Sequence, residues 1–259
     1  RLVRFGAEAQ TLDHFVRRHP DIAITAALED GDWGGTLEVL VLRAVREAVG
    51  DDIALMMDAN CAYSVPAARR ILMELEETRV HLFEEPLSPE NRHGYRELKG
   101  ISRTWIAAGE NEYTKIGYRD LISEGVLDVI QPDLGAAGGL TECQKIAAMA
   151  EVYNAQVAPH LYAGPVEWAA NVQLATAIPN ILMCECIETP FHDQLIKGSI
   201  RVEDGFITAP EAPGLGIEVD EDLARAHPYT GDGLHLEMRE APCDYVNGNN
   251  FQGGAPAES

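Results

Sequence analysis

Six side chains able to do acid–base or metal chemistry recur about every 25 residues, each after a short apolar run. They are Asp58, Glu84, Glu110, Asp133, His160 and Glu185. This interval accommodates one buried strand and one helix. Because the carboxyl ends of parallel strands meet at one edge of a sheet, we expect these six side chains to converge on a single site.

Three of these carboxylates end consecutive predicted strands: Asp58, Glu84 and Glu110. Three like charges so close repel one another unless a cation sits among them. Hard oxygen ligands, with water in the remaining positions, favour Mg²⁺ or Mn²⁺ over zinc. The alternative is that each carboxylate caps a helix or pairs with a surface lysine, which is less favoured for three residues in register.

The next two predicted strands end at Asp133 and His160. A carboxylate bonded to one ring nitrogen fixes the tautomer, raises the basicity of the imidazole and frees the other nitrogen for proton transfer. His160 is therefore predicted to be a general acid/base with Asp133 as its orienting partner. Glu185, or Glu188 in competition with it, would act as an auxiliary acid that hydrogen bonds a substrate oxygen.

The composition excludes several classes of function. A formal net charge of −22 over 259 residues opposes binding to nucleic acid and to anionic membranes, and it suits a metal cation. No apolar run reaches the roughly 18 residues that span a bilayer. The five cysteines are odd in number and lack the paired spacing of a zinc site, so they are expected to be reduced thiols. We expect a soluble cytoplasmic protein that forms a homo-oligomer and acts on a small molecule.

The elements that would carry these residues alternate strand and helix. Helix Thr36–Val49, for example, has apolar residues at helical spacing, and Pro165–Ala177 is a predicted helix near the end of the series. The predicted strands are Ile22–Leu28, Ile53–Met57, Val80–Phe83, Trp105–Ala108, Val126–Ile130, Ala155–Ala158 and Ile181–Met183. This order predicts the α/β class, a TIM-like barrel that lacks its first strand.

The expected domain boundaries lie where the regular alternation of strands and helices ends in the sequence. Residues 1–220 are expected to form the barrel, with residues 1–35 atypical and a helix at 11–18. Residues 221–259 are expected to be an extension that ends in a flexible tail rich in Gly, Asn and Pro. The chain starts at Arg1 instead of methionine, so we expect an N-terminal part to be absent.

Five short motifs in order carry a resemblance to a known family. They are Met57-Asp58-Ala59-Asn60, Phe83-Glu84-Glu85-Pro86-Leu87, Ala108-Gly109-Glu110-Asn111, Gln131-Pro132-Asp133 and Ala158-Pro159-His160. They resemble the successive strand ends of the enolase superfamily, in the mandelate racemase and muconate lactonizing enzyme family. The resemblance implies a barrel of the modified (β/α)7β type and covers about residues 36–220.

The resemblance also implies roles for individual residues. It selects Glu84 over Glu85 and Glu185 over Glu188, and it implies bound Mg²⁺ and a bidentate carboxylate substrate. The His160–Asp133 pair would abstract the α-proton, giving an enediolate stabilised by the metal. Further candidates for substrate or supporting contacts are Asn60, Glu85, Asn111, Gln131, Tyr162 and Trp168, of which the last two could equally be packing residues.

Departures from the family pattern narrow the reaction. Racemases of this family carry a Lys-X-Lys pair after the second strand, where this chain reads Ala26-Ala27-Leu28-Glu29-Asp30, and no lysine lies between Arg18 and Lys99. A site with one base suits syn elimination, so we expect a Mg²⁺-dependent aldonate or aldarate dehydratase, a carbon–oxygen lyase. The alternatives are a sugar-acid lactone cycloisomerase or a racemase/epimerase, and a truncated, non-catalytic metal-binding barrel without the N-terminal capping domain.

Overall fold

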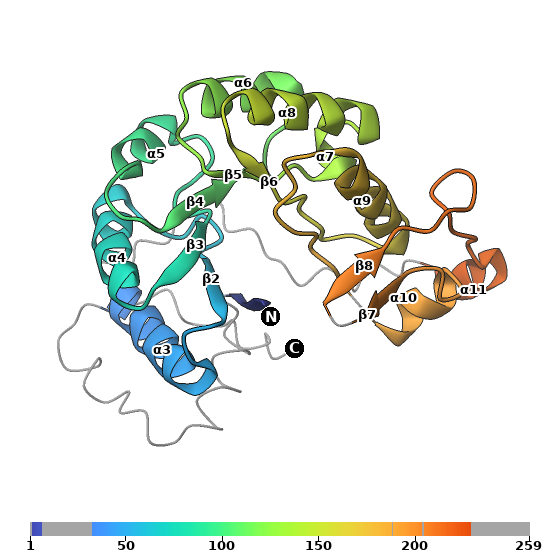
Figure 1. The fold of residues 1–259 in the computed structure, drawn as a ribbon, viewed down its shortest axis with the longest axis horizontal. Coiled ribbons are helices and arrows are strands. Elements are labelled where there is room, and N and C mark those ends of the chain that lie inside the picture. The colour runs from blue at the N-terminus through green and yellow to red at the C-terminus, as the bar shows by residue number, and fades with distance from the viewer. Residues whose placement is uncertain (1, 7–32, 188, 204, 229–259) are drawn as a thin grey trace, which may run out of the picture. The chain divides into compact units, whose positions relative to one another are not determined.

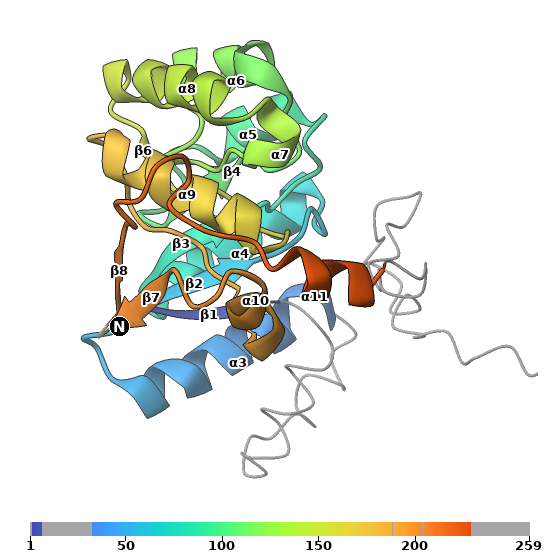
Figure 2. The ribbon, with the colours of Figure 1, turned by 90° about the vertical axis from the view of Figure 1, so that its right-hand side faces the viewer.

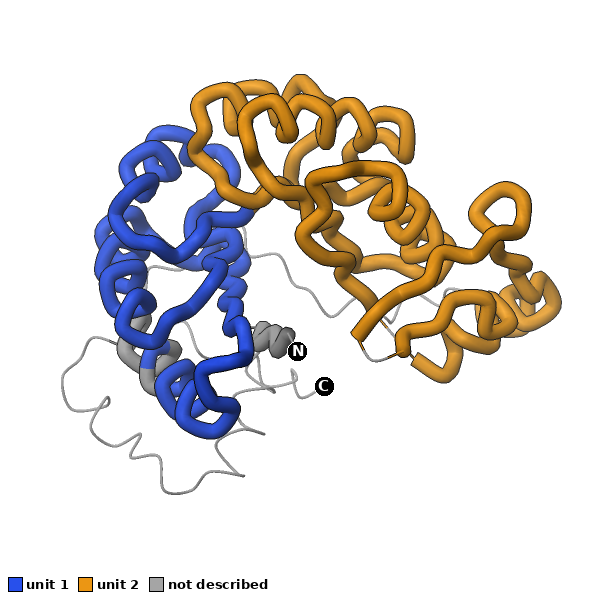
Figure 3. Tube along the Cα trace, in the orientation of Figure 1, with its two compact units in different colours: residues 1–107, 239–259 blue, residues 108–238 orange. Residues whose placement is uncertain are grey.

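The computed structural model describes residues 2–6, 33–187, 189–203 and 205–228 (Figure 1). The chain divides into two compact units, which Figure 3 colours separately. Unit 1 comprises residues 1–107 and 239–259, and unit 2 comprises residues 108–238. Among the described residues, no helix combines the length and apolar character needed to cross a bilayer.

Unit 1 is built from parallel strands joined by helices. Its strands pair in chain order, and its helices lie together along one side of them in Figure 1. The strands are β1 (Leu2–Gly6), β2 (Ala54–Asp58), β3 (Val80–Glu84) and β4 (Trp105–Ala108), and the helices are α3 (Trp33–Val49), α4 (Val65–Glu77) and α5 (Arg92–Leu98).

The core of unit 1 forms where α4 covers the sheet. Helix α4 buries Ala68, Ile71, Leu72 and Leu75, which recur at helical spacing on one face. Strand β3 supplies the fully buried Leu82 and Phe83. Strands covered on both faces read as near-continuous apolar runs, and this is why a polar residue at a strand's carboxyl end stands out in the sequence.

Unit 2 repeats the alternation with shorter strands, which an antiparallel hairpin and a last helix follow. Figure 2 shows its helices from the side. Strands β5 (Val129–Ile130) and β6 (Gln156–Val157) pair in parallel, and β7 (Arg201–Glu203) pairs with β8 (Phe206–Thr208). The helices are α6 (Thr114–Ser123), α7 (Leu134–Ala137), α8 (Leu140–Val152), α9 (Pro165–Ala177), α10 (Pro190–Leu195) and α11 (Glu221–Ala226).

A second apolar cluster holds the hairpin to helix α9. Trp168 of α9 is fully buried beside Leu161, and Val202 and Ile207 of the hairpin pack against the same cluster. Large aromatic side chains contribute most of the buried apolar area in such clusters. The segment after residue 190 is therefore anchored to the helix that follows His160.

Several elements differ from the sequence-based expectation. Strand β1 was not predicted, yet it pairs with β2 from Leu2–Ala54 to Gly6–Asp58. The expected strand at Ile181–Met183 is reduced to a single bridge between Ile181 and Val157. The hairpin and helices α10 and α11 were also missed, because they are too short to show a period. The expected helix at 11–18, the strand Ile22–Leu28 and the flexible tail lie outside the described residues.

Arg46 hydrogen bonds to three segments of unit 1 near the amino ends of its strands. Its guanidinium donates to the carbonyl oxygens of Gly50 and Ile53 at 2.8 and 2.7 Å, and of Thr78 and Arg79 at 3.1 and 3.0 Å. These carbonyls follow α3, precede β2 and follow α4. Carbonyls at the ends of helices lack intrahelical partners, so one side chain satisfies groups from three segments.

Arg46→Ala should lower the free energy of unfolding by about 2–3 kcal/mol, because hydrogen bonds to a charged donor are lost and four carbonyls are left without it. The measurement is urea denaturation followed by circular dichroism. Arg43→Ala is the matched control on the same helix. Its ion pair with Glu77 is exposed at both ends, so a loss of no more than about 0.5 kcal/mol is expected. Equal losses in the two variants would contradict the role of Arg46.

Candidate active site

Two buried carboxylates lie side by side in unit 1. Asp58 and Glu84 end β2 and β3 and are register partners across the two parallel strands. Each residue is only 5% exposed. Paired residues on neighbouring strands project to the same face of a sheet, so the two carboxylates are neighbours.

The turn after β2 fixes the Asp58 carboxylate. The backbone N–H of Asn60 donates to one oxygen of Asp58 at 2.9 Å, and the Asn60 side-chain amide donates to the other at 3.1 Å. Asn60 and Cys61 both adopt left-handed backbone conformations, with φ of 44° and 62°. Asparagine tolerates this region better than most residues, which explains its place here. Asn60 thus supports a predicted ligand.

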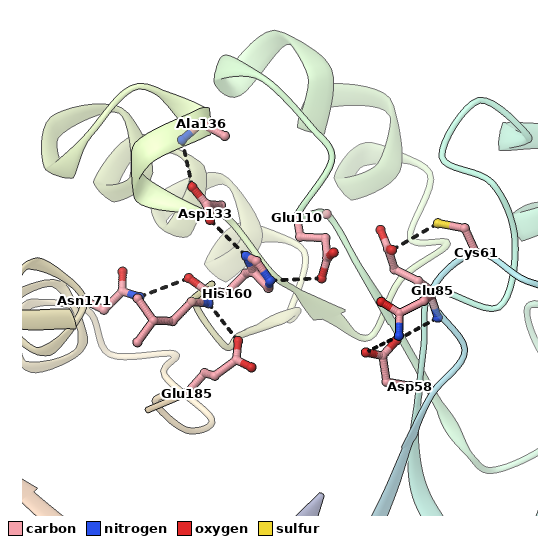
Figure 4. A network of polar contacts seen from close by, with 12 residues as sticks. Asp58, Cys61, Glu85, Glu110, Asp133, Ala136, His160, Asn171 and Glu185 are labelled. Atoms are coloured by element: carbon pink, nitrogen blue, oxygen red, sulfur yellow. Dashed lines mark hydrogen bonds and ion pairs between the residues drawn. The ribbon is translucent and has the colours of Figure 1, made fainter. Parts of the chain in front are cut away.

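Glu85 is more deeply buried than either predicted ligand of unit 1. It is 2% exposed, and its Oε2 accepts a hydrogen bond from the Cys61 thiol at 3.0 Å (Figure 4). Its φ of 36° is also left-handed, so consecutive residues of the Glu-Glu-Pro motif are turned in different directions. Glu85 therefore contacts the turn that holds Asp58, while Glu84 keeps its place at the end of β3.

In unit 2 the structure brings Asp133 and His160 together. Ala158 N–H donates to Ile130 O at 3.0 Å, and His160 N–H donates to Pro132 O at 3.2 Å. These bonds continue the pairing of β5 and β6 beyond the strand ends. As a result, His160 Nδ1 lies 2.9 Å from Asp133 Oδ2, as the sequence analysis expected (Figure 4).

The second ring nitrogen of His160 faces Glu110. Nε2 lies 3.4 Å from Glu110 Oε2, and the His160 side chain is 14% exposed. This nitrogen was expected to be available for proton transfer, and a predicted metal ligand lies beside it. Each ring nitrogen of His160 therefore faces a carboxylate, Asp133 at Nδ1 and Glu110 at Nε2. The arrangement can orient the imidazole for proton transfer at Nε2.

Asp133 is held in its ionised form. Burial opposes ionisation, but hydrogen bonds from His160 and from the Ala136 N–H outweigh it, so the pKa of Asp133 lies below its usual value. The Ala136 bond is 2.8 Å long and makes Asp133 the N-cap of α7. Asp133 therefore both starts a helix and holds the imidazole.

Glu167 belongs to this cluster and was missed by the sequence analysis. Its Oε1 accepts from the Gly135 N–H at 2.8 Å, and its carboxyl group lies beside that of Asp133 at this glycine. A signal was available in the sequence, because Glu167 stands two residues after Pro165 in the first turn of a predicted helix, where acidic side chains are favoured. Nothing in the spacing of the strand-end residues pointed to it.

Glu185 binds the backbone next to His160. Its Oε2 accepts from the Leu161 N–H at 2.7 Å, and the Asn171 side-chain amide donates to His160 O at 3.0 Å (Figure 4). Glu185 therefore fixes the segment that carries the imidazole. Its competitor Glu188 lies outside the described residues.

The remaining candidates occupy different environments. Gln131 is 4% exposed and its Oε1 has no hydrogen-bond partner among the described residues, so it could accept from a ligand hydroxyl. Asn111 is half-buried directly after Glu110. Tyr162 is 56% exposed. Trp168 lies wholly within the apolar cluster around α9, which is a packing position.

The structure describes the predicted metal ligands in two separate units. Asp58 and Glu84 belong to unit 1, and Glu110 belongs to unit 2. Within the described residues, no group of three or more His, Cys, Asp or Glu is arranged to hold a metal ion. The donor chemistry of unit 1 nevertheless fits Mg²⁺, because two buried carboxylates on one face supply hard oxygen ligands and require positive charge.

A cavity of about 470 Å³ lies at the opposite edge of unit 1, where β2 and β3 begin. Arg79, Arg103 and Glu76 are among the residues that line it. Arg79 is paired with Asp51, and Arg103 lies 3.6 Å from Glu76. Its position at the amino ends of the strands separates it from Asp58 and Glu84, so it is not part of the candidate site.

Residues 25–223 match the model of the protein family described as Enolase C-terminal domain-like. The chain is 36% identical over 202 residues to D-xylonate dehydratase from Haloferax volcanii, and 32% identical over 200 residues to D-galactarolactone cycloisomerase from Agrobacterium fabrum. These matches cover 77% and 73% of this chain, and 49% and 53% of the relatives. The chain thus spans about half the length of the curated relatives it matches.

A solved structure agrees with these matches. The mandelate racemase/muconate lactonizing enzyme-like protein from Roseovarius sp. TM1035 is 56% identical, with a TM-score of 0.77. The alignment covers 81% of this chain and 53% of that protein.

The depressed pKa of Asp133 predicts a loss of stability in acid. Asp133 takes up a proton at a lower pH in the folded state than in the unfolded state. Its stabilisation of the fold is therefore complete above the unfolded pKa of about 3.9, and it disappears as the pH falls through the lower pKa of the folded state. Asp133→Asn lacks this contribution. The gap in free energy of unfolding between the wild type and Asp133→Asn should therefore narrow between about pH 5 and pH 2.

Denaturant titrations at fixed ionic strength measure this gap. Asp222→Asn, in which an almost fully exposed carboxylate is neutralised, is the control and should show a much smaller change with pH. A gap for Asp133→Asn that stays constant across the range would contradict the hydrogen-bonded, ionised Asp133.

Proposed function

Because the chain belongs to the Enolase C-terminal domain-like family, we propose that it is the catalytic barrel of a sugar-acid dehydratase. Membership in the family and the similarity to solved members confirm the predicted fold class, an α/β barrel of the enolase superfamily. The observation that carries the proposal is the His160 imidazole, which bonds Asp133 through Nδ1 and turns Nε2 toward Glu110. The D-xylonate dehydratase relative supports it.

His160 would perform both proton transfers. Asp133 accepts from Nδ1, which keeps that nitrogen protonated and leaves Nε2 to take the proton from the α-carbon of the substrate. The same nitrogen then returns a proton to the β-hydroxyl as the carbon–oxygen bond breaks. Water leaves, and the enol that remains becomes a 2-keto acid. One base on one face is sufficient for this syn elimination.

Asp58, Glu84 and Glu110 would hold Mg²⁺ as carboxylate ligands. When bound, Mg²⁺ would supply positive charge that offsets the negative charge developing on the substrate carboxylate. Asn60 would keep the Asp58 carboxylate in a fixed orientation through its two hydrogen bonds. Glu110 would share its negative charge between the cation and the His160 Nε2 that it faces at 3.4 Å.

Glu185 would have a positioning role and an acid role. One of its oxygens accepts the Leu161 N–H next to His160, so the carboxyl group is fixed beside the imidazole-bearing segment. Its second oxygen would donate to a substrate oxygen if the carboxyl is protonated.

A lactone cycloisomerase is the second candidate function. It is favoured by the similarity to the D-galactarolactone cycloisomerase relative and by the same arrangement of one base and one acid. A racemase is less compatible, because it needs a proton donor on each face of the planar intermediate, and the chain lacks lysine between Arg18 and Lys99.

His160→Asn should lower the rate of dehydration by about 10²–10⁴-fold, because a general acid/base contributes that much to proton transfer. The assay incubates the chain with Mg²⁺ and a library of aldonic and aldaric acids in D₂O, and follows keto acid formation and deuterium at the α-carbon by NMR. His93→Asn, which alters an exposed imidazole, is the matched control and should keep full activity.

The product distinguishes the alternatives. Lactone conversion without keto acid would favour the cycloisomerase. Wild-type protein that binds Mg²⁺ but neither turns over nor exchanges the α-proton would favour the non-catalytic metal-binding barrel.

Removal of the metal should abolish turnover, and added Mg²⁺ or Mn²⁺ should restore it. Calorimetry should detect Mg²⁺ binding to the wild type and a loss of affinity of at least about tenfold in Asp58→Asn, because a ligand is neutralised. Asp52→Asn, an exposed aspartate near the start of β2, controls for the change in net charge. Turnover that persists in excess chelator would argue against the metal site.

A further inference from the structure

Glu167 joins two helices of unit 2 at their first turns. It lies on the first turn of α9, and its Oε1 accepts the backbone N–H of Gly135 in α7 at 2.8 Å. The next N–H of α7, at Ala136, is taken by Asp133. The first N–H groups of this short helix therefore donate one hydrogen bond to each of two carboxyl groups.

Gly135 is what allows the two groups to meet. A Cβ atom on Gly135 would stand 2.9 Å from Glu167 Oε2 and 3.3 Å from Asp133 Oδ1. Both oxygens therefore occupy the space that a side chain would need, and the two carboxyl groups lie side by side. A glycine at this position leaves room for an approach that any other residue would hinder.

Two carboxyl groups in contact cannot both ionise without strong repulsion. Burial first, and then the charge of Asp133, raise the pKa of Glu167, although the Gly135 N–H opposes the shift. The pKa of Asp133 moves in the opposite direction. The other titratable groups facing Glu167 are His160 after β6 and Cys143 on α8, whose thiol has a pKa raised to about 12, chiefly by burial.

We propose that Glu167 is a positioning residue that keeps a proton at neutral pH and donates it as a hydrogen bond to Asp133. Asp133 would then accept from three donors: His160 Nδ1, the Ala136 N–H and the Glu167 carboxyl group. Three donors fix the carboxylate in one orientation and keep it ionised. Glu167 would thereby set the orientation and basicity of His160 without touching the substrate.

This inference rests on the proposed function only in giving His160 the role of acid/base. The protonation of Glu167 stands on the contacts among Glu167, Asp133 and Gly135, and it can be measured in protein that shows no turnover. The experiment therefore has a spectroscopic part and a kinetic part.

The spectroscopic part is infrared spectroscopy of the full chain at neutral pH. The wild type should show the carbonyl stretch of a protonated carboxylic acid, and Glu167→Gln should lack it. Glu151→Gln, which makes the same change at an exposed carboxylate on α8, should keep the band. A wild-type spectrum without a band that depends on Glu167 would overturn the proposal, whatever the enzyme's activity.

The kinetic part compares substitutions that differ in hydrogen bonding. Glutamine has the shape of a protonated glutamate, donates to Asp133 and accepts from Gly135 N–H, so Glu167→Gln should keep kcat within about threefold. Glu167→Ala should lower kcat by about 10–100-fold with little change in KM, in line with supporting residues of catalytic sites. Gly135→Ala, which crowds the end of the Glu167 side chain and, less closely, Asp133 Oδ1, should also lower kcat.

The outcomes separate the two proposals. Loss of kcat in Glu167→Gln equal to that in Glu167→Ala would overturn the protonated hydrogen bond, because glutamine preserves it. Absence of turnover in the wild type, with the Glu167-dependent band present, would reject the proposed function and leave the assignment of the proton intact.

Discussion

Hydrogen bonding between parallel strands continues past the strand ends, and the candidate site depends on it. In unit 1, the N–H groups of Ala59 and Cys61 donate to the carbonyls of Glu84 and Glu85 at 3.0 and 2.8 Å. In unit 2, the pairing of β5 and β6 extends to His160. Loops at the carboxyl ends of strands are usually free to diverge, but here the first residues of neighbouring loops stay joined. The polar side chains are therefore positioned by backbone geometry rather than by their mutual attraction.

The site contains many acidic groups, and each buried carboxyl group is stabilised by different hydrogen-bond donors. Asp58 is surrounded by donors from Asn60. Glu85 accepts a hydrogen bond from the Cys61 thiol. Asp133 and Glu167 meet at Gly135, where one proton shared between the two carboxyl groups would remove one of the charges. Buried carboxylates are stable only with such compensation, so the network of donors is as much a requirement of the site as the carboxylates themselves.

The sequence predicted the parts of the site that follow from strand periodicity. Asp133 and His160 each end an apolar run on neighbouring strands, and their contact was expected because consecutive strands of a parallel sheet are adjacent. Glu167 was not predicted, because its contact depends on a glycine 32 residues earlier in the sequence and on the start of a four-residue helix. Strand β1 and the bridge at Ile181 were misjudged, since pairing in a sheet depends on the neighbouring strand as well as on local composition.

Arg46 anchors the end of unit 1 that lies opposite Asp58 and Glu84. One guanidinium ties the ends of α3 and α4 to the start of β2 through main-chain oxygens, whose presence does not depend on the neighbouring side chains. The amino edge of unit 1 can thus stay anchored whatever residues occupy the turns around it. Substitutions that change chemistry at the carboxyl edge lie at the other end of the same strands. Because stability and chemistry depend on opposite ends of the strands, mutations can change the substrate preference without first lowering the stability of the fold.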